Sequence, residues 1–183
     1  MSYQQDKMYL DEAVRAAELA TCPRRSVGCV LVDSARGRIV GRGFNGRAYG
    51  HAPCTADHQC DGAWLPRGKG LGSCEAIHSE ARALLARTDM VYDTAYVTVS
   101  PCVPCTRLLL ETGCLRVVFL ERCTSDDGAR EAFFRQPRAG AEWVLVKPNG
   151  SVEIDWVLVK PNGSVEIDRD FSVQRRTTTE IGI

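Results

Sequence analysis

Apolar and polar residues alternate along this chain with the two periods of an α/β protein. The first periodic segment, residues 7–21, predicts an amphipathic helix that ends before Pro23, because proline cannot continue a helix. Similar patterns predict helices over 75–87, 104–111 and 126–136, with Ser125 or Asp126 as the N-cap of the last one. Apolar runs predict strands over 27–33, 39–44, 95–99, 115–120 and 143–146. Strands that alternate with helices indicate an α/β fold whose layers enclose a central sheet.

Residues 45–76 interrupt this pattern. Hydrophobic periodicity is absent there, and glycine, proline, histidine and cysteine are concentrated. A loop of this length is uncommon in a compact domain unless something holds it together. We therefore expect an insert that is tied by a metal.

A repeat marks the C-terminal part. The segment WVLVKPNGSVEID occupies residues 143–155 and recurs unchanged at 156–168. Each copy has the pattern of a strand, a Pro-Asn-Gly turn and a second strand, whereas natural repeat arrays diverge and need several units to stack. We expect one domain over residues 1–155, followed by a tail, 156–183, that is peripheral or disordered.

Composition narrows the classes of partner. The 183 residues carry 23 basic and 23 acidic side chains, so the formal net charge is zero. A protein that grips a nucleic-acid backbone usually has a basic excess, so we expect a small substrate and no nucleic acid. The sequence shows no apolar run of membrane-spanning length and no signal core after Met1, which predicts no membrane partner and a cytoplasmic protein, in the host cytoplasm if the origin is viral.

Two short motifs carry the candidate chemistry. His78-Ser79-Glu80 is followed by Pro101-Cys102-Val103-Pro104-Cys105, with 24 residues from His78 to Cys102. A catalytic zinc takes three protein ligands and leaves a fourth position for water, and His78, Cys102 and Cys105 supply that set. This H-x-E and P-C-x-x-C pair is the signature of zinc nucleobase deaminases. Glu80 is then the proton shuttle for a water that attacks C4 of a pyrimidine.

Around these motifs the chain resembles the deoxycytidylate (dCMP) deaminase family over about residues 7–146. The resemblance depends on Cys22-Pro23-Arg24-Arg25-Ser26-Val27-Gly28, on Gly43-Phe44-Asn45-Gly46, on the Cys-rich insert and on the two zinc motifs. It implies a three-layer α/β/α cytidine deaminase-like fold with a mixed sheet of about five strands. It also implies hydrolysis of dCMP to dUMP for thymidylate synthesis.

Further roles follow from the resemblance. The substrate contacts are expected from Asn45 on the sugar or phosphate side, from Arg24 or Arg25 on the 5′-phosphate, and from Ser79 and Ser100. The segment Gly43, Phe44, Asn45 and Gly46 is expected to help form an allosteric site for dCTP with magnesium, or for dTTP. Relatives are often homo-oligomers, in particular hexamers.

The chain also departs from the family pattern. Ser79 stands where alanine is usual, Arg82 where asparagine is usual, and Phe44 where tyrosine is usual. No aromatic residue follows the fourth strand over 121–126. The alternatives therefore include a 5-substituted dCMP or dCTP as substrate, and also a nucleic-acid deaminase or a non-catalytic zinc-stabilised nucleotide-binding module.

Nine cysteines are many for a protein in a reducing compartment. Four of them offer a closed structural zinc site that would tie the insert: Cys22, Cys54, Cys60 and Cys74. His51 or His58 could replace one of these ligands, and free loop cysteines are the alternative. Three others are predicted to be structural: Cys29, Cys114 and Cys123.

Overall fold

The computed structural model describes residues 2–55, 59–63, 65, 73–123, 128–135, 140–159 and 165–170, with the backbone alone over 155–159 and 165–170. In this part of the chain, four helices flank one sheet of seven strands in the order β2-β1-β3-β4-β5-β6-β7. The strands are β1 (Gly28–Asp33), β2 (Arg38–Phe44), β3 (Thr94–Val99), β4 (Arg116–Glu121), β5 (Glu142–Val146), β6 (Val152–Val159) and β7 (Val165–Asp170).

The sheet is mixed. Strands β2, β1 and β3 pair antiparallel, β3, β4 and β5 pair parallel, and β5, β6 and β7 are again antiparallel. The predicted mixed central sheet is confirmed, but the expected count of about five strands is too low. The two further strands, β6 and β7, come from the repeated segment, whose second half continues the sheet.

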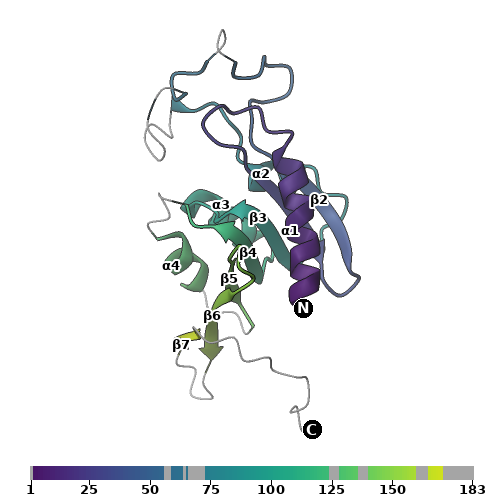
Figure 1. The fold of residues 1–183 in the computed structure, drawn as a ribbon, viewed down its shortest axis with the longest axis vertical. Helices are drawn as coiled ribbons and strands as arrows, with labels where there is room; N and C mark the ends of the chain where they lie inside the picture. Colours follow the sequence, from purple (N-terminus) through teal and green to yellow (C-terminus); the bar gives the residue numbers. More distant parts are fainter. Residues whose placement is uncertain are drawn as a thin grey trace.

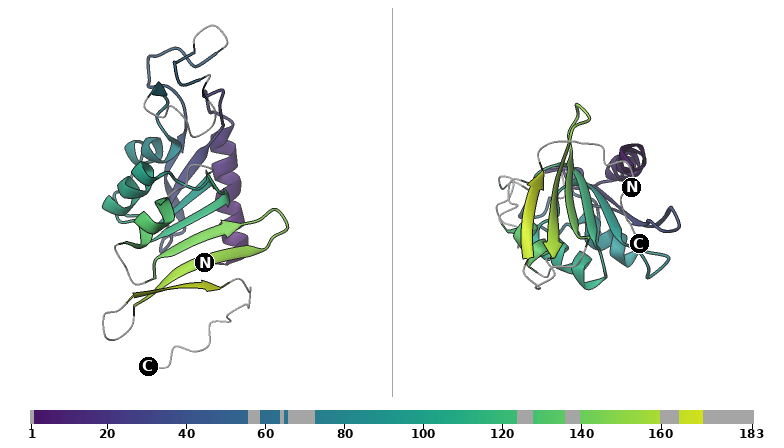
Figure 2. Two further views of the ribbon diagram at one scale, coloured as in Figure 1. Left: turned by 90° about the vertical axis from the view of Figure 1, so that its left-hand side faces the viewer. Right: turned by 90° about the horizontal axis from the view of Figure 1, so that it is seen from below.

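The helices form a layer on each face of this sheet. Helix α1 (Tyr3–Ala17) packs against β1 and β3 on one face. Helix α2 (Ser79–Leu85) packs against β2 and β1, and α3 (Val103–Glu111) packs against α4 (Ala129–Phe134). Figures 1 and 2 show α1 on one side of the strands and the other three helices on the opposite side, which confirms the three-layer α/β/α arrangement.

Side-chain alternation along the strands divides the core between the two faces. Cys29 and Leu31 join the cluster under α2, α3 and α4, whereas Val30 and Val32 join the cluster under α1. In the larger cluster the ring of Trp143 packs against Phe119 and Phe133, at centroid distances of 5.4 and 5.3 Å. Because strands β1 and β3 are buried on both faces, their sequences read as nearly continuous apolar runs.

The predicted bounds of the first two helices are wrong. Helix α1 begins at Tyr3, because Ser2 and Gln5 form a capping box there, and it ends at Ala17, before the predicted end at residue 21. Helix α2 begins at Ser79, because Ile77 is paired with Gly46 in an antiparallel bridge that keeps the preceding residues extended. Of the predicted helix 126–136, the structure shows Ala129–Phe134, and Ser125 and Asp126 lie outside the described residues.

The two strands of each repeat copy pair with each other, and the register is the same in both copies. Trp143 faces Asp155 across β5 and β6, and Trp156 faces Asp168 across β6 and β7. Each copy therefore contributes a hairpin, and β6 contains the end of the first copy and the start of the second. Strand β7 lies at one edge of the sheet, at the opposite end of the molecule from the insert (Figure 2). The division into a 1–155 domain and a tail stays a prediction, and residues 171–183 lie outside the described part.

No helix within the described ranges is both long and apolar enough to cross a membrane.

Candidate active site

His78 lies where the insert ends and helix α2 begins. It is the N-cap of α2 and has an extended backbone, with φ −70° and ψ 153°. The residue before it, Ile77, exchanges two backbone hydrogen bonds with Gly46, at 2.9 and 3.2 Å. This bridge fixes the backbone just before His78, and the first turn of α2 fixes it just after.

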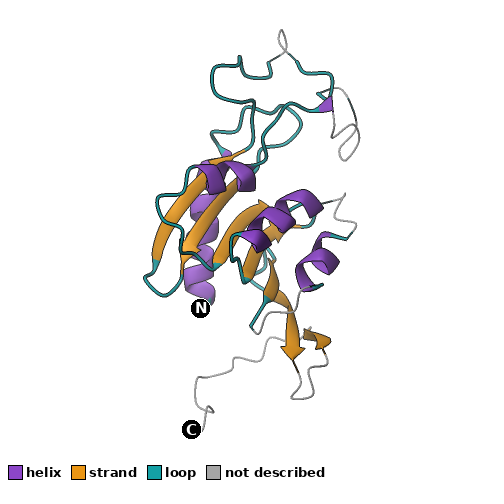
Figure 3. Ribbon diagram, turned by 180° about the vertical axis from the view of Figure 1, so that it is seen from behind, coloured by secondary structure: helices purple, strands orange, loops and turns teal. Residues whose placement is uncertain are grey.

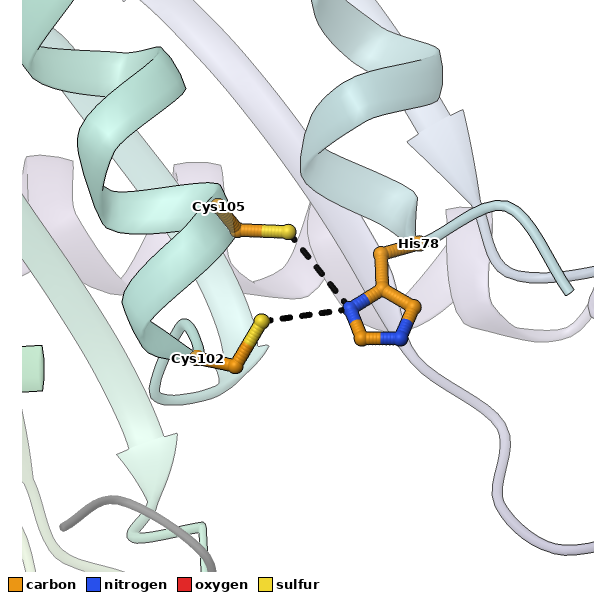
Figure 4. A group of neighbouring side chains, drawn as sticks. All are labelled: His78, Cys102 and Cys105. Carbon is orange, nitrogen blue, oxygen red and sulfur yellow. Dashed lines mark hydrogen bonds between the residues drawn. The ribbon is translucent and has the colours of Figure 1, made fainter. Parts of the chain in front are cut away.

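Cys102 and Cys105 lie at the start of α3. Cys102 is its N-cap, with φ −76° and ψ 167°, and its carbonyl accepts from the Thr106 amide at 2.8 Å. Proline in the first turn suits a position whose amide has no helical partner. The two sulfur atoms are 3.4 and 3.5 Å from His78 Nδ1, as Figure 4 shows. In the described ranges this trio is the one group of three or more potential ligands whose atoms all lie within 4.8 Å of one another.

The geometry fits a tetrahedral zinc. With Zn–S at about 2.3 Å and Zn–N at about 2.0 Å, ligand atoms of a tetrahedron are about 3.5 Å apart. The measured separations of 3.4 and 3.5 Å match that value. Two sulfurs and one imidazole are also the donor set of a catalytic zinc that keeps one open position.

The three side chains polarise one another. The hydrogen bond with Cys105, followed by that with His78, lowers the pKa of the Cys102 thiol to about 4. The hydrogen bond between Cys102 and Cys105 raises the pKa of the Cys105 thiol. The hydrogen bond between Cys102 and His78 raises the pKa of the His78 imidazole. This lowered pKa favours the thiolate form of Cys102, the form that binds a dication.

Glu80 lies beside this trio in the first turn of α2. Its side chain is 4% exposed, and Ser79 Oγ donates to Glu80 Oε2 at 3.0 Å. Burial raises the pKa of Glu80 above the ordinary 4.5, whereas the charge of His78 acts to lower it. A buried carboxyl group with a raised pKa is suited to both accepting and donating a proton.

The predicted substrate contacts lie on the loops around the trio. Asn45 is buried, and its amide joins two parts of the preceding loop: its oxygen accepts from the Val27 amide at 2.8 Å and its nitrogen donates to the Arg25 carbonyl at 2.7 Å. Arg25 Nη2 forms an ion pair with Glu121 at 2.6 Å. Asn45 therefore shapes the loop that carries both candidate arginines.

Two further predicted substrate contacts, Arg24 and Ser100, lie on different sides of the site. Arg24 lies near Cys74 of the insert, where burial raises the pKa of the thiol and the charge of Arg24 only partly opposes this rise. Ser100 is buried at the end of β3, and its Oγ accepts from the Cys123 amide at 2.8 Å. Arg25 is held beside the carboxyl end of β4 by its ion pair with Glu121, and the Ser100 amide donates to the Glu121 carbonyl.

The glycines of the Gly43-Phe44-Asn45-Gly46 segment have a packing role. A Cβ on Gly43 would lie 2.1 Å from the Ser79 carbonyl, and a Cβ on Gly46 would lie 2.2 Å from Thr21 Oγ1. Gly43 therefore permits β2 to approach α2 closely, and Gly46 permits the loop after β2 to approach Thr21 in the loop that follows α1. This requirement is independent of any allosteric role of the segment.

The four insert cysteines interact electrostatically: Cys60 with Cys54 and Cys74, and Cys22 with Cys54 and Cys74. Within the described residues their sulfur atoms do not form a ligand group of the kind made by His78, Cys102 and Cys105. Bonding by the Glu75 amide is the main cause of the lowered pKa of Cys60, whereas burial raises the pKa of Cys54. His51 is exposed, and His58 lies outside the described residues.

The three cysteines predicted to be structural lie away from that group. Cys29 and Cys114 are fully buried, which confirms the expectation for Cys29, and Cys114 Sγ donates to the Arg116 carbonyl. The sequence did not predict that Arg82, which stands where asparagine is usual in the family, forms hydrogen bonds with the loop after β2.

Comparisons with known proteins agree with the geometry. A family model of the cytidine and deoxycytidylate deaminase zinc-binding region matches residues 3–121. The deoxycytidylate deaminase of Mycobacterium phage D29 is 39% identical over 121 residues, which cover 62% of this chain and 92% of that protein. The deoxycytidylate deaminase of Schizosaccharomyces pombe is 34% identical over 119 residues, but these are only 36% of that protein.

Solved structures show the same fold. The dCMP deaminase of cyanophage S-TIM5, crystallised in complex with dCMP and dUMP, matches with a TM-score of 0.62 at 20% identity, over 79% of this chain and 98% of that chain. Its apo form matches with a TM-score of 0.55 at 21% identity, over 72% of this chain and 94% of that chain.

Proposed function

The chain belongs to the family defined by the cytidine and deoxycytidylate deaminase zinc-binding region, and on that basis we propose that it catalyses the hydrolytic deamination of dCMP to dUMP and ammonia. The observation that carries the proposal is the convergence of His78, Cys102 and Cys105 beside the buried Glu80. The similarity to the phage D29 deoxycytidylate deaminase supports dCMP as the substrate.

Each site residue has a role in this proposal. His78, Cys102 and Cys105 hold a zinc ion, which when bound supplies a Lewis acid that activates water. Glu80 takes a proton from the water as its oxygen attacks C4 of the cytosine. Glu80 delivers this proton to N3. It then takes the remaining proton from the hydroxyl on C4 and passes it to the amino group, so that the C4–N bond breaks, ammonia leaves and C4 becomes a carbonyl. Because Glu80 is buried and hydrogen-bonded by Ser79, it starts each turnover in a fixed position.

Substrate binding is proposed to involve the loops around the zinc ligands. Arg25, and Arg24 on the insert side, are the candidates for the 5′-phosphate, since guanidinium groups bind phosphate in a bidentate manner. Asn45 and Ser79 are proposed to contact the sugar and the base, and Ser100 the same cavity from β3. The two hydrogen bonds already made by the Asn45 amide leave it one further donor hydrogen for substrate.

A second, structural zinc is proposed at Cys22, Cys54, Cys60 and Cys74. The electrostatic interactions of Cys60 with Cys54 and Cys74, and of Cys22 with Cys54 and Cys74, support it. Such a site would crosslink the insert to Cys22, which lies in the loop between α1 and β1.

The wider biological role follows from the family and is proposed with it. The product dUMP would feed thymidylate synthesis in the cytoplasm, of the host if the source is viral, as the phage relatives suggest. Regulation by dCTP with magnesium and by dTTP is proposed at Gly43–Gly46, in a homo-oligomer that is expected to be a hexamer.

A substrate panel tests the proposal. The zinc-loaded protein is incubated with dCMP, deoxycytidine, dCTP and 5-methyl-dCMP, with and without dCTP and magnesium as activator, and ammonia release is measured. Preferential turnover of dCMP supports the proposal. Preference for 5-methyl-dCMP or dCTP would change the substrate but keep the reaction. Turnover of none of the four would refute it and favour a nucleic-acid substrate or a non-catalytic nucleotide-binding module.

A further inference from the structure

Arg82 makes an unusual set of contacts for a helix surface residue. It lies on α2 one turn after His78, and its amide donates to the His78 carbonyl at 3.0 Å. Its guanidinium reaches away from the helix, and Nη2 donates to the carbonyls of Gly46 and Arg47 at 2.9 and 2.8 Å. The same group lies over the ring of Phe44, 4.8 Å from its centroid, and 5.8 Å from the ring centroid of Tyr49.

The segment that Arg82 holds connects the catalytic helix to the other loops. On one side, Gly46 is bridged to Ile77, the neighbour of His78. On the other side, the backbone of Asn45 bonds the Thr21 amide and the Val27 carbonyl, both at 3.1 Å. Residues 44–47 therefore lie between the His78 backbone and the loop 21–27.

Asn45 extends this connection to the candidate phosphate-binding residue. Its side chain bonds the carbonyl of Arg25 and the amide of Val27. A shift of the 44–47 segment would therefore move the Arg25 backbone. Since arginine binds phosphate with a directional fork of donors, a small displacement of its backbone weakens the contact.

We propose that Arg82 is a positioning residue that fixes the 44–47 segment on α2 and, through Asn45, places Arg25 for the 5′-phosphate of the substrate, so that Arg82 sets substrate affinity and not the rate of deamination. This inference rests on the proposed dCMP activity. It gives a physical role to two departures from the family pattern, arginine at 82 and phenylalanine at 44. The ring of Phe44 offers a face to the guanidinium, and the cation–π contact needs no hydroxyl.

The test measures binding and turnover separately. We expect Arg82→Ala to raise KM for dCMP about tenfold, since displacing Arg25 would cost one of its charged hydrogen bonds to the phosphate, which is worth about that factor in affinity. The kcat should stay within about twofold of the wild-type value, because Glu80 and the zinc ligands do not contact the guanidinium. Arg82→Lys keeps the charge and the donors and should recover most of the lost affinity. Arg87→Ala removes an equal charge just beyond the same helix and serves as the control.

Calorimetric binding in a Glu80→Gln background gives a readout without turnover. The proposal requires that Arg82→Ala weaken dCMP binding about tenfold and weaken deoxycytidine binding by a clearly smaller factor, because deoxycytidine lacks the phosphate that Arg25 is proposed to bind. Equal losses for both ligands, a fall in kcat at constant KM, or no effect at all would overturn the inference alone. If the wild-type protein neither binds nor deaminates dCMP, the proposed function falls first. If Arg82→Ala does not fold, the same comparison is made with Arg82→Met, which keeps the side-chain stem but removes the donors to Gly46 and Arg47, and with Phe44→Leu. Unchanged dCMP binding in both of these variants would equally overturn the inference.

Discussion

A buried ion pair between α1 and the sheet makes a quantitative prediction about stability. Both oxygens of Asp6 accept from Arg116, at 2.6 Å from Nη1 and 2.8 Å from Nη2. The Asp6 side chain is 7% exposed and that of Arg116 is 13% exposed. The hydroxyl of Tyr96 also donates to Asp6 Oδ1 at 2.8 Å, and burial, followed by the charge of Asp6, raises the pKa of Tyr96 so that it stays a donor.

The change Asp6→Leu removes one side of this pair. Breaking a buried pair costs about 3–5 kcal/mol of unfolding free energy, because the remaining charge is left without its partner. Arg116 keeps two further partners, since its Nε donates to Glu142 Oε2 at 2.5 Å and its Nη1 donates to the Tyr96 hydroxyl at 3.3 Å. We therefore expect the lower end of the range, about 3 kcal/mol.

Urea unfolding at equal zinc content measures the effect. Asp11→Ala on the same helix is the matched control, because the Lys7–Asp11 pair is exposed and should contribute less than about 1 kcal/mol. The double variant Asp6→Leu/Arg116→Met should recover most of the loss, since it leaves no buried charge of the pair without its partner. A loss below about 1 kcal/mol for Asp6→Leu, or no recovery in the double variant, would refute the reasoning.

Three further predictions concern the metal sites and the pH profile. Cys105→Ser should lower the bound zinc by one ion per chain and abolish turnover, which atomic emission and ammonia release measure. The control Cys114→Ser, in the core away from the trio, should keep the zinc content and the turnover. Cys60→Ser should remove the other zinc and lower the thermal midpoint of unfolding; a protein that keeps its full zinc content would count against the structural site. Burial raises the pKa of Glu80 above 4.5, and this carboxyl must be ionised to accept a proton, so kcat/KM should fall as the pH drops through that raised value. A profile that stays flat down to pH 4.5 would contradict this role of Glu80.

The sequence predicted most of the strands and the helix order, because both faces of the central strands are buried and their apolar runs are unambiguous. It placed the start of α1 late, although Ser2 and Gln5 carry a capping-box signal. It placed the start of α2 early, because the bridge between Ile77 and Gly46 joins residues far apart in the chain and has no local signature. The strand count was low because the pairing of the repeat is likewise a tertiary event.

The candidate site was accessible to sequence reasoning for a different reason. Its zinc motif lies at two helix starts, and the spacing within each motif fixes the local geometry. The contacts of Arg82 and Arg116 were not accessible, because each reaches partners that only the folded sheet brings near. A lone arginine in a helix or strand is usually a solvated charge, and its sequence carries no sign of burial.

The most direct test of the central claim compares wild-type protein with Glu80→Gln. The substitution keeps the size of the side chain but removes its ability to take up a proton. Both proteins are brought to equal zinc content, and conversion of dCMP to dUMP is followed together with ammonia release. The account predicts turnover by the wild type and a loss of about 10²- to 10⁴-fold in Glu80→Gln, the usual contribution of a general acid–base group. Undiminished turnover in Glu80→Gln, or none in the zinc-loaded wild type, would contradict it.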